Sequence, residues 1–270
     1  PSLRSRVHFM KIYLNGDIVA VNEARIDPMD RGLLLGDGLF ETFSVKAGKA
    51  RRIDRHLNRL NRGCEIINLP YPRHIEPAIA EIISANGIVN GSVRLTLTRG
   101  LGPRGVLPLL NIQPTIMISA TEITTLSQEP IKAIIAESTR RNEFSPLSQC
   151  KCLNYLDNII ARQEADARGA DEALLRNTVG NIAEATASNL FLVIEDRLVT
   201  PPISDGALPG VVREEILVDA EEQTLEPQDI AKASEAFLTN SLEVRPLISV
   251  NGQRIGSGEV GLFTKKFLDK

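Results

Sequence analysis

The sequence contains no tryptophan, and only 4% of its residues are aromatic. It also lacks an excess of positive charge, because 34 acidic residues outnumber 31 lysines and arginines and give a net charge of −3. Proteins that bind nucleic acid need a basic surface for the phosphates and often use aromatic side chains for base stacking. We therefore expect no nucleic-acid partner.

Long apolar stretches are absent as well. No uninterrupted run reaches the roughly 18 residues that a membrane-spanning helix needs. The first ten residues carry two arginines and a histidine where a secretory signal would be apolar. The sequence therefore predicts neither a membrane partner nor an export signal.

Cysteine and histidine are scarce, with three residues of each. The cysteines, Cys64, Cys150 and Cys152, form an odd set with one close pair, which favours a reducing compartment, the cytoplasm, over a disulfide framework. The pair has no second pair or histidine at a ligand spacing, so no metal site is expected. Nucleophile-elbow and nucleotide-binding motifs are also missing. A chain with so few catalytic devices of its own points to an organic cofactor.

Hydrophobic periodicity predicts an α+β protein with two halves. An Asn-Gly pair at residues 15–16 separates two short alternating segments, as in a β-hairpin. The polar stretch 121–130 has no periodicity and predicts a linker between an N-terminal domain at 10–120 and a C-terminal domain at 131–270. Predicted strands cover 11–14, 17–21, 93–98, 115–119, 131–137, 172–175, 189–193, 236–239 and 246–250, and predicted helices cover 56–67, 75–83, 153–168 and 211–220.

One lysine, Lys151, stands in largely uncharged surroundings, between residues 145 and 155 at the start of a predicted helix. Desolvation lowers the pKa of a lysine and favours the neutral amine that forms a Schiff base with an aldehyde. A lysine whose stem packs along the helix start while its charge reaches water is the alternative from local sequence.

The motifs around Lys151 follow one another in the order typical of one family. On them, the chain resembles the class IV aminotransferases, which are fold-type IV pyridoxal-phosphate enzymes. The resemblance covers nearly the whole chain from residue 11, and implies a two-domain α+β fold with pyridoxal 5'-phosphate bound between the domains. The motifs are Asp30-Arg-Gly-Leu-Leu-Leu-Gly-Asp-Gly-Leu-Phe-Glu-Thr42, Arg55-His-Leu-Asn-Arg-Leu60, Lys151-Cys-Leu-Asn-Tyr-Leu156, Gly169-Ala-Asp-Glu-Ala-Leu-Leu175, Glu184-Ala-Thr-Ala-Ser-Asn-Leu-Phe191, Thr200-Pro-Pro202 and Leu208-Pro-Gly-Val-Val-Arg213.

The resemblance assigns three charged residues to the cofactor. Lys151 matches the lysine that binds it as a Schiff base and later moves the proton at the substrate Cα. Glu184 matches the carboxylate that faces the pyridine nitrogen and keeps it protonated, so that the ring accepts electrons. Arg59 matches the arginine that binds the phosphate, for which a guanidinium fork is well suited.

The remaining cofactor contacts are implied in the same way. Gly210, Val211 and Val212 match a phosphate-binding turn at a helix start, where main-chain N–H groups face the anion. Many relatives have a threonine in place of Val212, so this chain is expected to rely more on main-chain donors and on the arginine. Ser241 matches a hydroxyl on the other side of the phosphate, and Tyr155 matches a residue that contacts the phenolic oxygen of the ring.

The reaction is less closely defined, because the superfamily includes aminodeoxychorismate lyases, D-amino-acid transaminases and branched-chain transaminases. The stretches 36–42, 99–105 and 239–242 favour the lyase that forms p-aminobenzoate and pyruvate, with Phe40, Asn240, Arg104 and then Arg99 as substrate-binding residues. Val106 replaces a tyrosine common in lyases, and the stretch 241–246 is one residue short. D-amino-acid transaminases typically have tyrosine at the position of Phe40 and histidine at that of Val106.

Transamination with a 2-oxo acid is therefore the alternative, and an inactive cofactor-binding protein is a third reading that the intact Lys151, Glu184 and Arg59 oppose. The resemblance further implies a homodimer with sites at the subunit boundary. Arg104 would then reach the carboxylate of a small amine substrate across that boundary.

Overall fold

The computed structural model describes residues 10–103, 105–109, 112–123 and 128–268, and the chain forms two compact units. The first unit comprises Pro1–Thr125 together with Cys150–Asn154, and the second comprises Leu126–Gln149 and Tyr155–Lys270. The chain thus enters the second unit, returns to the first for five residues, and leaves again. The predicted division at 121–130 did not include this return.

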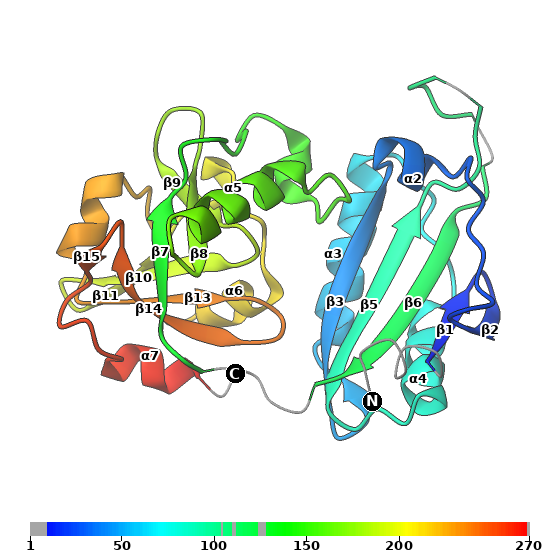
Figure 1. The fold of residues 1–270 in the computed structure, drawn as a ribbon, viewed down its shortest axis with the longest axis horizontal. Helices are drawn as coiled ribbons and strands as arrows, with labels where there is room; N and C mark the ends of the chain where they lie inside the picture. Colours follow the sequence, from blue (N-terminus) through cyan, green and yellow to red (C-terminus); the bar gives the residue numbers. More distant parts are fainter. Residues whose placement is uncertain (1–9, 104, 110–111, 124–127, 269–270) are drawn as a thin grey trace. The chain divides into compact units, whose positions relative to one another are not determined.

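A six-stranded antiparallel sheet, in the order β2-β1-β6-β5-β3-β4, forms the centre of the first unit (Figure 1). The predicted hairpin is confirmed, with Asn15 and Gly16 at φ angles of 53° and 113° between the first two strands. Positive φ at both positions matches a turn whose twist suits a hairpin. The strands are β1 (Lys11–Leu14), β2 (Asp17–Ala20), β3 (Gly38–Lys46), β4 (Lys49–Ala50), β5 (Gly91–Thr98) and β6 (Thr115–Glu122).

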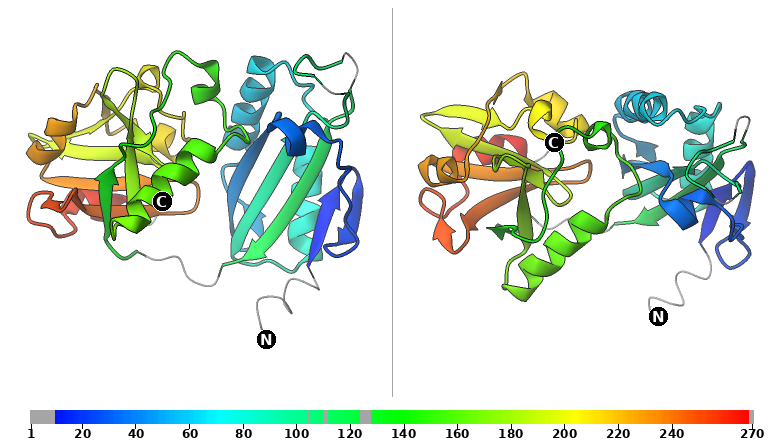
Figure 2. Two further views of the ribbon diagram at one scale, coloured as in Figure 1. Left: turned by 45° about the horizontal axis from the view of Figure 1, so that its top comes forward. Right: turned by 90° about the horizontal axis from the view of Figure 1, so that it is seen from above.

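Two helices, α3 (Ile53–Ile66) and α4 (Ile75–Ala85), cover one face of this sheet (Figure 2). Because side chains alternate along a strand, every second residue of β3 and β5 enters the core beneath these helices, as Phe43 and Leu95 do. The residues between them, including Phe40, lie on the opposite face of the sheet. The short helix α2 (Arg31–Leu35) precedes β3 and is capped by the Asp30 side chain.

The second unit has a nine-stranded sheet in the order β12-β11-β10-β13-β14-β7-β8-β9, with β15 paired to β14. Its strands are β7 (Ile131–Ile135), β8 (Glu172–Arg176), β9 (Ile182–Ala185), β10 (Asn189–Ile194), β11 (Arg197–Thr200), β12 (Glu221–Glu222), β13 (Glu235–Thr239), β14 (Val244–Val250) and β15 (Gln253–Arg254). Its helices are α5 (Leu156–Ala167), α6 (Val211–Ile216) and α7 (Leu262–Phe267), and its 3₁₀ turns are η1 (Pro146–Gln149), η2 (Ile203–Asp205) and η3 (Pro227–Lys232).

Three predicted helix limits differ from the structure by three or more residues, and one of them is the start of α3, which lies at Ile53 and not at residue 56. Helix α5 begins at Leu156 and not at residue 153, because residues 151–153 hydrogen-bond to β3. Helix α6 ends at Ile216 and not at residue 220, since the chain then turns into β12. Among the described residues, no helix is long and apolar enough to cross a membrane.

Candidate active site

Lys151 lies on a short extended segment that pairs with β3. Its carbonyl oxygen accepts the Phe40 N–H at 2.8 Å, and the Leu153 N–H donates to the Gly38 carbonyl at 3.0 Å. Cys150 and Cys152, on either side of the lysine, are buried in the core of the first unit. Two main-chain hydrogen bonds therefore hold the backbone from which the Lys151 side chain extends.

The side chain of Lys151 turns to the sheet face that bears Phe40, and its Nζ lies 4.5 Å from the centre of the Phe40 ring. A glycine is required at position 38, because a Cβ there would meet the Leu97 carbonyl oxygen and the Leu153 side chain. The glycines of the motif thus allow the lysine segment to approach β3 closely. Phe40 itself is buried, and it remains a predicted substrate-binding residue.

Arg59 is held by a buried carboxylate on β3. Its Nε donates to Glu41 Oε1 at 2.8 Å and its Nη2 to Oε2 at 2.6 Å, while His56 Nδ1 lies 2.7 Å from Oε2. All three side chains are at most 4% exposed. The bidentate contact fixes the plane of the guanidinium. Phosphate binding by Arg59 remains a prediction, and Glu41 and His56 are the residues that position it.

Burial alone would raise the pKa of Glu41, but the charge and hydrogen bonds of Arg59, together with His56, lower it from 4.5 to about 2. Burial also lowers the pKa of His56, although Glu41 acts in the opposite direction. The lowered pKa favours a neutral imidazole, which donates a hydrogen bond to Glu41 from Nδ1. The cluster is thus an ionised pair supported by a neutral histidine.

This shift predicts acid sensitivity. The pKa of Glu41 is lower in the folded chain than in the unfolded chain, so its contribution is complete above pH 4.5 and is lost as the pH falls toward 2. At 1.36 kcal/mol per pKa unit, the lowered pKa of Glu41 contributes about 3 kcal/mol to the free energy of unfolding. Urea unfolding of wild type and of Glu41→Gln at pH values from 3 to 6 measures it.

The wild type should lose stability faster than Glu41→Gln as the pH falls below 4.5. At neutral pH the variant should be less stable by about 3–5 kcal/mol, because Arg59 is left as an uncompensated buried charge. Glu81→Gln, an exposed position on α4, is the control and should follow the wild type. Equal pH slopes for wild type and Glu41→Gln would contradict the role of this pair.

In the second unit, Glu184 on β9 is held by groups from three segments. Its Oε1 lies 3.1 Å from Arg141 Nε, and its Oε2 accepts the Leu208 N–H at 2.9 Å. Asn189 lies 3.5 Å from the same Oε2 through Nδ2, which also donates to the Leu208 carbonyl at 2.9 Å. These donors stabilise a negative charge on a side chain that is 8% exposed. The motifs did not single out Arg141, because nothing in the local sequence distinguishes it from Arg140.

Asn189 also connects Glu184 to the predicted phosphate-binding residues. Gly210 is the residue before α6, and a Cβ there would overlap Asn189 Oδ1, so only glycine allows this approach. Val211 and Val212 are buried in the first turn of α6. The structure thus brings Glu184 and the start of α6 together within the second unit, around one asparagine.

The loop between β13 and β14 carries Asn240 and Ser241. Asn240 Oδ1 accepts the N–H groups of Leu242 at 2.9 Å and Glu243 at 3.1 Å, which fixes the turn. The neighbouring Thr239 pairs in register with Asn189, and its buried Oγ1 has no hydrogen-bond partner among the residues that the structure describes. A buried hydroxyl in this state fits a site that receives an additional polar ligand.

Tyr155 is half-buried and precedes the first residue of α5, where its carbonyl accepts the Ile159 N–H at 2.9 Å. Its contact with the phenolic oxygen of the cofactor remains a prediction. Arg104 lies outside the described residues.

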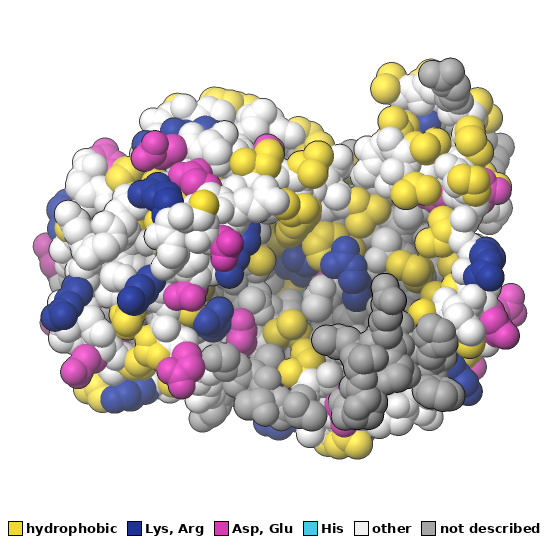
Figure 3. Space-filling view, viewed as in Figure 1, with side chains coloured by type: hydrophobic (Ala, Val, Ile, Leu, Met, Phe, Trp, Pro, Cys, Tyr) yellow, Lys and Arg dark blue, Asp and Glu magenta, His cyan; other side chains and the backbone are white. Residues whose placement is uncertain are grey.

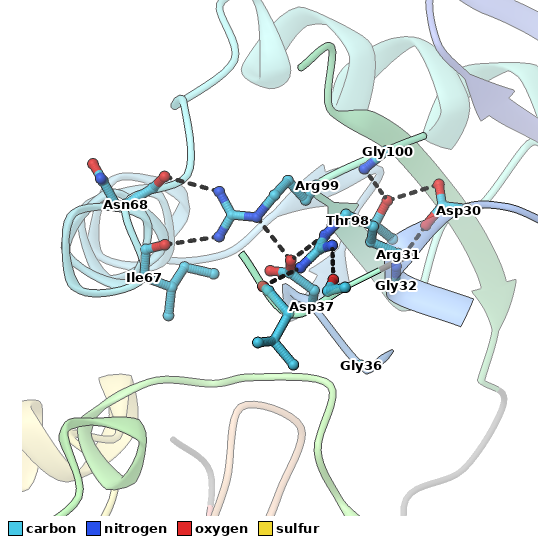
Figure 4. Close-up of polar contacts among 12 residues, drawn as sticks. Asp30, Arg31, Gly32, Gly36, Asp37, Ile67, Asn68, Thr98, Arg99 and Gly100 are labelled. Carbon is cyan, nitrogen blue, oxygen red and sulfur yellow. Dashed lines mark hydrogen bonds and ion pairs between the residues drawn. The ribbon is translucent and has the colours of Figure 1, made fainter. Parts of the chain in front are cut away.

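Arg99 lies in a buried cluster at the end of β5 (Figure 4). Its Nε donates to Asp37 Oδ2 at 2.8 Å, and its terminal nitrogens donate to the carbonyls of Asn68 and Ile67 at 2.9 and 2.8 Å. Burial would raise the pKa of Asp37, but Arg99 and Arg31 together lower it. These contacts give Arg99 a structural role that joins β5 to the end of α3, and substrate binding by Arg99 remains a prediction.

Arg31 fixes the loop that follows β5. It donates to the same Asp37 oxygen at 2.8 Å and to the carbonyls of Gly105 and Val106 at 2.7 and 2.8 Å. The loop that contains position 104 is therefore anchored on its C-terminal side by a buried arginine.

Comparison with known proteins identifies the family. Residues 38–250 match the model of amino-transferase class IV. The chain therefore belongs to this family and is a pyridoxal-phosphate-dependent enzyme, as the resemblance implied. When bound, the cofactor supplies the aldehyde that takes up an amino group and a ring that accepts the electrons of the Cα–H bond.

Among curated relatives, a Methanocaldococcus jannaschii protein provisionally named a branched-chain-amino-acid aminotransferase is 33% identical over 97% of this chain and 95% of its own length. The D-alanine aminotransferase of Staphylococcus haemolyticus is 27% identical over 95% of this chain and 94% of its length.

Two solved structures show the same fold. The branched-chain amino acid aminotransferase of Escherichia coli has a TM-score of 0.90 and 25% identity, over 96% of this chain and 92% of that one. A Legionella pneumophila protein provisionally named a 4-amino-4-deoxychorismate lyase has a TM-score of 0.83 and 28% identity, over 90% and 92%.

Proposed function

We propose that the chain is an aminotransferase that moves the amino group of a branched-chain amino acid to a 2-oxo acid such as 2-oxoglutarate. The observation that carries this proposal is the end-to-end similarity to relatives named as aminotransferases, at 33% identity for the branched-chain type and 27% for the D-alanine type. The lyase reaction favoured by the sequence motifs is less well supported, since the lyase name belongs to a structural neighbour, whereas the curated relatives described above are named as aminotransferases. The transaminase alternative is therefore preferred.

Branched-chain amino acids are preferred over D-alanine for a local reason. Phe40 and Val106 stand where D-amino-acid transaminases typically have a tyrosine and a histidine, so neither side chain offers a hydrogen bond to a substrate carboxylate. Lys151 would hold the cofactor and move the proton at the substrate Cα, and Glu184 would face the ring nitrogen. Arg59, Gly210, Val211, Val212 and Ser241 would bind the phosphate.

A substrate panel tests this function. Purified holoenzyme is mixed with L-leucine, L-valine, D-alanine or aminodeoxychorismate, with and without 2-oxoglutarate, and the products are identified by mass spectrometry. We expect glutamate and the branched 2-oxo acid from L-leucine and L-valine. If D-alanine is the sole amine converted, the substrates are D-amino acids and not branched-chain amino acids. If p-aminobenzoate forms without 2-oxoglutarate, the enzyme is the lyase. A cofactor absorbance that no amine changes would indicate an inactive binding protein.

We also propose a homodimer, on the basis of an exposed apolar surface of the first unit. Helix α2 and the loop after β5 are joined through Arg31, and apolar side chains gather on this part of the face shown in Figure 3. Exposed apolar groups of this extent commonly mark an interface. The surface consists of Leu33, Leu34, Leu35, Leu101, Val106, Leu107 and Leu109, whose exposed fractions range from 47% to 85%.

If the enzyme is a dimer with shared sites, its molecular mass in solution and its activity should fall together on dilution. Leu107→Glu places a charge on the proposed surface and should shift the mass measured by light scattering toward the monomer, with loss of the activity to which Arg104 of the partner subunit would contribute. Val89→Glu, at an exposed position before β5, is the control. A fully active monomer would contradict the proposal.

The three cysteines are buried, and none of them forms a disulfide with another described residue. We accordingly propose a reducing compartment, the cytoplasm, as the place where the enzyme works.

A further inference from the structure

One polar residue, Asn158, lies on the inner face of α5, which is otherwise built from alanines. The other buried residues of this helix are Ala161 and Ala165, and they pack in the same core as β8, next to which the helix lies (Figure 1). Asn158 is only 7% exposed, and it lies in the first turn of the helix, three residues after Tyr155. A buried amide in apolar surroundings needs a hydrogen-bond partner.

The partner of Asn158 is the main-chain carbonyl of Thr186. Asn158 Nδ2 donates to this oxygen at 2.6 Å. Thr186 follows the last residue of β9 and is 5% exposed, so its carbonyl is a buried acceptor just beyond the end of a strand. Buried main-chain oxygens of this kind are normally satisfied by a donor, and here the donor comes from the helix.

Thr186 is held at all three of its polar groups. Its N–H donates to the Ala173 carbonyl at 3.1 Å, and its hydroxyl donates to Glu172 Oε1. Both of these partners belong to β8, whereas Asn158 belongs to α5. The corner at residues 186–188, which joins β9 to β10, is therefore fixed to a strand and to a helix.

This hydrogen bond connects two residues of the predicted cofactor site. Glu184 comes two residues before Thr186, and it is predicted to face the ring nitrogen of the cofactor. Tyr155 directly precedes the helix that carries Asn158, and it is predicted to contact the phenolic oxygen of the ring. The nitrogen and the phenolic oxygen belong to one rigid, planar ring. The spacing between the two side chains therefore has to match that ring.

We propose that Asn158 is a positioning residue, which sets the spacing between Tyr155 and Glu184 for the cofactor ring. It acts through the Thr186 carbonyl and not by contact with the cofactor. The inference rests on the cofactor contacts that the proposed function gives to these two residues, but not on which amine is converted. Groups that are held in place before a ligand arrives bind it more tightly, because less ordering is needed on binding.

The test measures binding of pyridoxal 5'-phosphate to the apoenzyme by absorbance titration. In Asn158→Ala the dissociation constant should rise by about 10-fold, the effect of losing about one buried hydrogen bond. Asn158→Asp keeps the shape of the side chain but cannot donate when ionised, so it should lose affinity to a similar extent. Gln163→Ala removes an exposed amide from the same helix and is the control, which should stay within about twofold of the wild type.

A double-variant cycle shows whether the effect reaches the ring. Tyr155→Phe removes the hydroxyl that is predicted to contact the cofactor, and it is combined with Asn158→Ala. If Asn158 positions this tyrosine, the loss of affinity caused by Tyr155→Phe should be about threefold smaller in the Asn158→Ala background than in the wild type. A residue that serves the fold alone would lower the unfolding midpoint and leave the two losses of affinity additive. Additive losses would overturn the inference.

Hydrogen exchange of the apoenzyme is a readout that needs no cofactor. The N–H groups of Ala185 and Thr186 donate to the carbonyls of Ser188 and Ala173. In Asn158→Ala both should exchange about 10-fold faster, because the corner is released from the helix. The N–H of Asn15, which donates to the Ile116 carbonyl in the first unit, should exchange as in the wild type. Unchanged exchange at the corner would contradict its attachment to α5.

The failure of this inference is distinguishable from that of the proposed function. If the wild type converts no branched-chain amino acid but Asn158→Ala still binds the cofactor more weakly, the proposed function is wrong and the inference stands. If wild type and Asn158→Ala bind the cofactor equally well, the inference is wrong even where transamination occurs.

Discussion

Replacing Lys151 with alanine should reduce turnover by at least about 10³-fold, because a positioned general base contributes about 10²–10⁴-fold and the covalent attachment of the cofactor is lost with it. The fold should survive the change. The hydrogen bonds that hold this segment to Phe40 and Gly38 use main-chain atoms, and the contact of Nζ with the Phe40 ring adds only about 0.5–1 kcal/mol.

The measurement combines steady-state rates, cofactor absorbance and the unfolding midpoint. Borohydride reduction of the wild-type holoenzyme, followed by peptide mapping, should attach the cofactor to the peptide that contains Lys151. Lys46→Ala is the control, since Lys46 is exposed at the far end of β3, the strand with which the Lys151 segment pairs. If the cofactor is attached to another lysine, or if Lys151→Ala keeps its turnover, the assignment of the site is wrong.

Replacing Glu184 with glutamine should lower kcat by about 10²–10³-fold, the usual cost of removing one preorganised electrostatic group from an active site. A neutral amide cannot balance a protonated ring nitrogen, so the ring would accept electrons less readily. The free energy of unfolding without cofactor should also fall by about 1–3 kcal/mol, since Arg141 loses its ion pair in a site with little exposure.

A double variant separates these two effects. Replacing Arg141 with glutamine in the Glu184→Gln background removes the uncompensated charge and should recover part of the stability, but none of the activity. The absorbance of the bound cofactor against pH is the readout that a purely structural role would leave unchanged. Glu137→Gln, at an exposed position after β7, is the control. Full activity of Glu184→Gln would show that this carboxylate does not face the ring.

Local sequence patterns were sufficient for elements whose signal is contained within a few residues. The hairpin at Asn15-Gly16 and the amphipathic helices α3 and α4 were predicted because turn chemistry and a helical repeat are short-range properties. Strand β3 was not predicted as a strand, because it is buried on both faces at residues 38–41 and includes a charged residue, Glu41. A carboxylate in the core of the first unit is explained by the contacts of Glu41 with Arg59 and His56, which lie on α3.

The site residues divide in the same way. Lys151, Glu184 and Arg59 were predicted as site residues from ordered motifs, whereas the residues that hold them were not predicted. Arg141 is far from Glu184 in the chain, so their ion pair cannot be inferred from the local pattern.

The return of Cys150–Asn154 to the first unit has a consequence for biosynthesis. A nascent chain that has left the ribosome only as far as Thr125 lacks two buried side chains of its first core, Cys150 and Cys152. The first unit can therefore be completed only after the 24 residues Leu126–Gln149, which belong to the other unit, have been synthesised. A gene fragment that ends at the apparent linker would encode an unfinished fold, and the amine at position 151 would be left on the other polypeptide.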